Sequence, residues 1–188
     1  MRTNLTAINE ILDKNHSLFN LNLQDFYKFI NSIIDKKDFV DSNIRELAFD
    51  IIMNVLNKNK VKFENELSLL KDVSERLFKY ALEIDKEIPN DWLSPQVDHY
   101  FDYEEHKEEQ VEFSVSTIER LIGIFDKKKM MTLISEAVMT LIKETSDWRY
   151  KYVALMTISE ITEHIDDNNG LDNIIEVEYF NFRLYYLT

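Results

Sequence analysis

The chain has 188 residues, of which 22 are basic and 35 acidic, so its formal net charge is -13. It contains two glycines, two prolines and no cysteine. These counts exclude disulfide frameworks, thiolate metal sites and glycine-rich phosphate loops, and the negative charge opposes non-specific binding to nucleic acid.

Apolar residues recur at the 3.6-residue period of an amphipathic helix in most of the chain. In chain order, helices are expected over residues 5–12, 26–34, 44–56, 63–84, 111–125, 130–142 and 150–165. The pattern is most regular from Ile44 to Leu56, where seven apolar residues all fall on one stripe. No apolar run approaches the ~20 residues that span a bilayer, so no membrane insertion is expected.

One segment, residues 85–112, interrupts the helical pattern. It has ten acidic and two basic residues, so it carries -8 of the net charge of -13. Both prolines, Pro89 and Pro95, also lie in it, and proline ends helices because it lacks the amide donor. The sequence therefore predicts a long acidic loop inserted between two helices.

Two of the expected helices share a local pattern of an aspartate, a base four residues later and an alanine three residues after the base. The pattern occurs at Asp41, Arg45 and Ala48 and again at Asp147, Lys151 and Ala154. The aspartate is expected to cap the helix, and the base to pair with an aspartate. The 106 residues from Arg45 to Lys151 fit two helix pairs of ~40 residues plus the insertion. A stack of helix pairs and an ordinary helical bundle are both compatible with this spacing.

The segment 147–161 resembles part of the karyopherin-beta (importin-beta) nuclear transport receptors, in their importin-five-like branch. It reads Asp-Trp-Arg-Tyr-Lys-Tyr-Val-Ala-Leu-Met-Thr-Ile-Ser-Glu-Ile. Residues 43–50 are similar to an upstream helix of those receptors with the pattern Arg-x-Leu-Ala. Between the two, the receptors have an acidic insertion that opens with Asp-Trp, as Asp91 and Trp92 do here, and a later Asp-Arg helix. Here Glu119-Arg120 stands in that later helix.

The resemblance covers roughly residues 20–165 and implies an all-α fold. The expected architecture is a right-handed α-α superhelix, a HEAT-repeat solenoid of about three to four helix pairs, with the acidic loop inserted. The HEAT-repeat segment would span 1–165, with the acidic insertion at 85–112 and a divergent C-terminal tail at 166–188. Because the receptors are several times longer, the resemblance implies an internal fragment. The tail departs from the family pattern, either as a capping segment or as an ending foreign to the receptor.

The resemblance implies a non-enzymatic protein that carries cargo into the nucleus by binding and release. Its partners would be basic cargo proteins with nuclear localisation signals, the GTPase Ran in its GTP form and, for the full-length receptor, nucleoporins. No cofactor, metal or nucleic acid is expected, and the protein would shuttle between cytoplasm and nucleus. The alternative is a HEAT-type scaffold or adaptor outside nuclear transport, and a helical-bundle enzyme is the third hypothesis.

The acidic insertion is the candidate partner-binding site, because its carboxylates would attract and pair with a basic signal beside an aromatic face. The residues assigned to it are Asp91, Trp92, Asp98, Asp102, Glu104, Glu105, Glu108 and Glu109. The competing interpretation is a solvated loop that keeps the protein soluble. Trp148 is expected to pack over the start of a helix instead of binding a partner.

Overall fold

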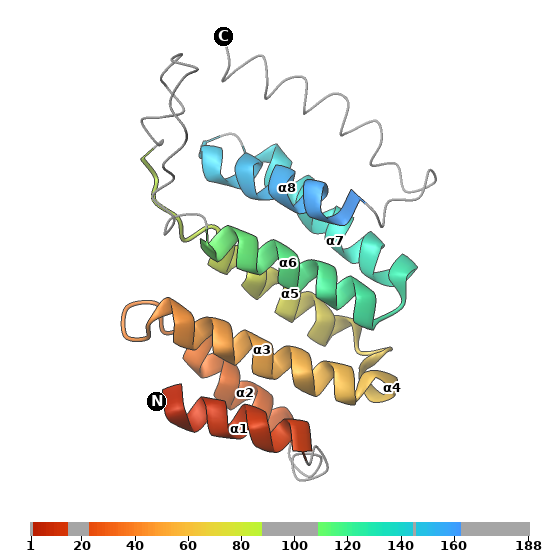
Figure 1. Ribbon diagram of the computed structural model, residues 1–188. Helices are drawn as coiled ribbons and strands as arrows, with labels where there is room; N and C mark the ends of the chain where they lie inside the picture. Colours follow the sequence, from red (N-terminus) through yellow and green to blue (C-terminus); the bar gives the residue numbers. More distant parts are fainter. Residues whose placement is uncertain (1, 15–22, 88–108, 145, 163–188) are drawn as a thin grey trace, which may run out of the picture. The chain divides into compact units, whose positions relative to one another are not determined.

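The computed structural model describes residues 2–14, 23–87, 109–144 and 146–162, and the regular elements in these ranges are helices (Figure 1). The expected all-α fold is therefore confirmed for this part of the chain. The helices are α1 (Arg2–Lys14), α2 (Leu23–Ile34), α3 (Ser42–Lys58), α4 (Lys60–Phe63), α5 (Leu67–Ala81), α6 (Glu109–Ile124), α7 (Lys127–Lys143) and α8 (Trp148–Ile161). None of these helices is long and apolar enough to cross a membrane.

The chain divides into two compact units, Met1–Leu67 and Ser68–Thr188. The first unit is built on α3, which packs against both α1 and α2. Because two helices cover α3, its burial extends well beyond one stripe. Its buried apolar residues are Ala48, Phe49, Ile51, Ile52, Met53, Val55 and Leu56. By contrast, Phe29, an apolar residue of the helix expected over 26–34, is 50% exposed.

The second unit contains α5 to α8 in two layers. Helices α6 and α8 lie side by side, with α5 and α7 behind them in Figure 1, and α7 packs against both α6 and α8. Tyr80 near the end of α5 meets Phe113 near the start of α6 edge to face, with ring centroids 6.2 Å apart. Only Phe125 and Asp126 separate α6 from α7, so these two helices run antiparallel.

Two predicted boundaries differ from the structure. The single helix expected over 63–84 is divided, because α4 ends at Phe63 and α5 covers only Leu67–Ala81. The acidic insertion was expected to extend to residue 112, but α6 already begins at Glu109. Glu109 and Glu112 thus occupy the first turn of α6, where the positive end of the helix dipole favours carboxylates.

Candidate partner-binding site and its anchor

Most of the residues assigned to partner binding lie outside the part of the chain that the structure describes. These are Asp91, Trp92, Asp98, Asp102, Glu104, Glu105 and Glu108. The remaining one, Glu109, is exposed at the start of α6. The structure therefore describes the two ends of the acidic insertion, residues 85–87 and 109–112.

The first end of the insertion is held by the start of α8. Arg149 Nη1 donates hydrogen bonds to the carbonyl oxygens of Leu82 and Ile84, both at 2.9 Å. Trp148 Nε1 donates to the carbonyl oxygen of Lys86 at 2.8 Å. Since all three carbonyls follow the last residue of α5, these bonds hold the chain just beyond that helix and fix the point from which the insertion departs.

Arg149 is itself oriented by Asp147, the N-cap residue of α8. The Asp147 carboxylate accepts hydrogen bonds from Arg149 Nε at 3.0 Å, from Nη2 at 2.6 Å and from the Arg149 backbone N–H at 3.1 Å. The Arg149 side chain is only 14% exposed and the Asp147 side chain 18%. The side-chain hydrogen bond between them lowers the pKa of Asp147 and raises the pKa of Arg149. We call Asp147, Trp148 and Arg149 the α8 anchor.

Trp148 packs at the start of α8, as the sequence predicted. Its ring is half-buried and lies beside Tyr152, with ring centroids 5.8 Å apart and the planes tilted by 55°. With its indole N–H donated to Lys86, the side chain combines an apolar contact with a polar one, the usual arrangement for a partly buried tryptophan.

The first unit uses a similar arrangement. Arg45 of α3 is 5% exposed, and its Nε donates to the carbonyl oxygen of Ile34, the last residue of α2, at 2.7 Å. Asp41 and Asp147 both cap their helices, which confirms that part of the predicted repeat. The base that reaches another helix end in the second copy is Arg149, two residues before the Lys151 that the spacing had favoured.

The ion pair of the α8 anchor makes stability depend on pH. Because the folded-state pKa of Asp147 lies below its ordinary value of 3.8, the pair stabilises the fold above that pH. This contribution is lost as the pH falls through the folded-state pKa. Asp147→Asn should therefore lower the free energy of unfolding at pH 7 and flatten its decline below about pH 4. Urea unfolding at a series of pH values from neutral to acidic measures this difference.

The matched control is Asp126→Asn, which changes the N-cap carboxylate of α7 in the same way. The Asp126 carboxylate accepts from the Lys129 backbone N–H at 2.8 Å. Asparagine is an equally good N-cap residue, so the control tests the loss of a capping charge without the loss of the arginine pair. Equal flattening of the pH profile in both variants would contradict the role assigned to Asp147 and Arg149.

A groove of about 380 Å³ borders the anchor in the second unit. It lies between α5 and α7, and its lining combines polar side chains with apolar ones, among them Phe78, Leu82, Leu133 and Leu141. Leu82 belongs to both features, because its carbonyl accepts from Arg149. Among the residues that the structure describes, no group of three or more histidine, aspartate or glutamate side chains is placed to hold a metal ion.

No protein family matches this chain, and no curated protein matches it. The function is therefore inferred from the residues that carry the resemblance and from the geometry of the two ends of the insertion.

Proposed function

We propose that the chain is a segment of a HEAT-repeat nuclear import receptor that binds basic cargo and Ran in its GTP form. One observation carries the proposal. The Asp-Trp-Arg sequence of the segment that resembles these receptors is the α8 anchor, and it binds the chain where the acidic insertion begins. Two landmarks that are far apart in the sequence, residues 147–149 and residues 82–86, are thus adjacent in space.

The arrangement of the second unit supports a stack of helix pairs. Tyr80 late in α5 meets Phe113 early in α6, which fits an antiparallel pair, and α7 and α8 form the next pair. Helices α6 and α8 pack directly against each other, so the pairs contact through equivalent helices. Nearest-neighbour stacking of this kind is the organisation of HEAT repeats.

The proposed mechanism is binding and release without covalent chemistry. A segment with a net charge of -8, tethered to α8 at one end and continuous with α6 at the other, attracts lysine and arginine side chains of a localisation signal. Its carboxylates then form charge-assisted hydrogen bonds with those side chains. Ran-GTP would release the cargo by competing for this surface or reshaping it, and the full-length receptor would shuttle between cytoplasm and nucleus with the help of nucleoporins.

Neutralising the insertion tests the site. In the full chain, five acidic residues are changed to their amides: Asp91→Asn, Asp98→Asn, Asp102→Asn, Glu104→Gln and Glu105→Gln. Exposed ion pairs contribute roughly 0.2–1 kcal/mol each, so the affinity for a lysine- and arginine-rich peptide should fall about tenfold or more. The loss of affinity with rising salt should also become shallower. Fluorescence anisotropy of the labelled peptide at several salt concentrations measures both effects.

The control variant removes the same number of charges from exposed positions elsewhere, so that both variants have a net charge of -8. Its substitutions are at Glu10, Asp25, Asp38, Glu66 and Glu160, all of which are exposed. Equal weakening in the two variants would contradict a localised site, and so would unchanged binding after neutralisation of the insertion. Addition of Ran-GTP then separates the two functions, because a receptor releases the peptide, whereas a HEAT-type scaffold outside nuclear transport retains it.

A further inference from the structure

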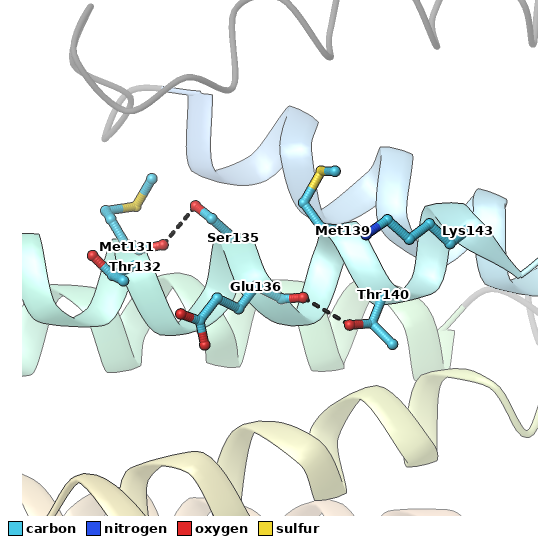
Figure 2. A pocket seen from close by; sticks show the side chains of 7 residues that line it. All are labelled: Met131, Thr132, Ser135, Glu136, Met139, Thr140 and Lys143. Atoms are coloured by element: carbon cyan, nitrogen blue, oxygen red, sulfur yellow. Dashed lines mark hydrogen bonds between the residues drawn. The ribbon is translucent and has the colours of Figure 1, made fainter.

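A second groove, of about 500 Å³, runs along one face of α7 (Figure 2). Its lining extends from Met131 to Lys143, a distance of about 18 Å along the helix axis. In Figure 2, Met131, Ser135 and Met139 lie on the same side of α7. The side chains that line it all come from this one helix, and two of them, Glu136 and Thr140, also line the groove between α5 and α7.

The hydroxyl-bearing side chains of this face bond to their own helix. The hydroxyl groups of Thr132, Ser135 and Thr140 each donate to the carbonyl oxygen four residues earlier, at 3.0, 2.6 and 2.9 Å. An occupant therefore has no hydroxyl donor to satisfy and can cover the face with apolar groups. Met139, which is half-buried on this face, is suited to such an occupant, because the flexible thioether side chain adapts its shape to aromatic rings.

We propose that the C-terminal segment of this chain, residues 163–188, docks on the α7 groove. The segment follows Thr162 directly, at the end of α8. Because α8 packs against α7 and follows it after a short connection, the end of α8 lies at the same end of the pair as Met131. The 26 residues from 163 to 188 span up to about 85 Å when extended, several times the length of the groove.

The composition of the segment fits the groove. Its last part carries five aromatic residues, Tyr179, Phe180, Phe182, Tyr185 and Tyr186. Aromatic rings pack favourably against methionine sulfur, and burying them removes a large apolar area from water. The charges at the rim also match, since Glu136 and Lys143 line the groove while Arg183 and Glu178 flank the aromatic residues.

The absence of cysteine from the sequence makes a direct test possible. In the full chain, Ser135→Cys on α7 is combined with Asn181→Cys in the C-terminal segment. A second protein combines Ser159→Cys, an exposed position on α8, with the same Asn181→Cys. Thiol–disulfide exchange with glutathione gives the effective concentration of each cysteine pair. We expect the effective concentration of the pair at positions 135 and 181 to be at least about tenfold higher than that of the pair at positions 159 and 181, because docking holds the first two thiols together.

An undocked segment predicts the opposite order. Position 159 is closer to position 181 along the chain than position 135 is, so random closure favours the Ser159 pair by about threefold. The proposal is overturned if the two pairs have equal effective concentrations, or if the Ser159 pair has the higher one. Covalent dimers as the main product of the Ser135 pair would also overturn it, because a second copy would then occupy the groove. Changing Phe180 and Phe182 to serine should abolish the preference for Ser135, and a preference that persists in this variant would contradict the aromatic contact.

Discussion

Replacing Arg149 by alanine should lower the free energy of unfolding of the second unit by about 2–4 kcal/mol. The substitution removes two charge-assisted hydrogen bonds to the carbonyls of Leu82 and Ile84 and leaves the Asp147 carboxylate without its cation. Urea unfolding followed by tryptophan fluorescence measures the loss. Hydrogen exchange of the amides in residues 80–87 locates it, because the last turn of α5 should open first.

Lys151→Ala is the matched control, because Lys151 is the base that the sequence repeat favoured and is half-buried on the same helix. It should change the free energy of unfolding by no more than about 0.5 kcal/mol. The free energy of unfolding of the Arg149→Lys variant should lie between those of the two alanine variants. Lysine keeps the charge but cannot contact the Asp147 carboxylate and the carbonyls after α5 at the same time. If the alanine variants at 149 and 151 lose equal stability, the α8 anchor does not hold the end of α5.

Replacing Arg45 by alanine should destabilise the first unit by about 2–4 kcal/mol. Arg45 is 5% exposed, and its loss removes the donor to the Ile34 carbonyl and leaves a cavity between α2 and α3. Hydrogen exchange should show the largest change at the last turn of α2. The exposed base of that helix, Lys28, provides the control, because Lys28→Ala should change stability by less than about 0.5 kcal/mol.

Arg45→Met separates the two contributions to that loss. Methionine fills much of the space of the arginine side chain but donates no hydrogen bond, so its cost reports mainly the unsatisfied Ile34 carbonyl. A methionine variant as stable as the original protein would show that the hydrogen bond to Ile34 contributes nothing. A methionine variant as unstable as the alanine variant would assign the whole effect to that bond.

The helices were predictable because the apolar period is preserved within each of them. Segments 111–125 and 130–142 correspond closely to α6 (Glu109–Ile124) and α7 (Lys127–Lys143). The break before α5 was not predictable from this signal. Phe63 continues the apolar stripe, while the backbone turns so that the Glu66 N–H donates to the Phe63 carbonyl, a tighter contact than the helical one. Side-chain periodicity does not report where backbone hydrogen bonding changes.

The composition of the candidate site was predictable, but the geometry of its anchor was not. The acidic insertion is visible as a local excess of charge, and Asp147 is visible as a capping residue. The role of Arg149 depends on the end of α5 lying beside the start of α8, a contact between residues 65 positions apart. Repeat spacing instead selected Lys151, because a base four residues after an aspartate fits a helical pair. The shorter Asp-x-Arg spacing was the signal that could have identified Arg149.

The division of the chain into two units also has a spectroscopic consequence. Both tryptophans, Trp92 and Trp148, belong to the second unit. Tryptophan fluorescence therefore reports the unfolding of the second unit alone, whereas far-UV circular dichroism, which arises from peptide bonds, reports both units together. After Trp92→Phe, the remaining indole is the one bonded to Lys86, at the first residues of the insertion. The protein thus carries an intrinsic reporter at the base of its acidic segment, and ligand titrations can be read there without an added dye.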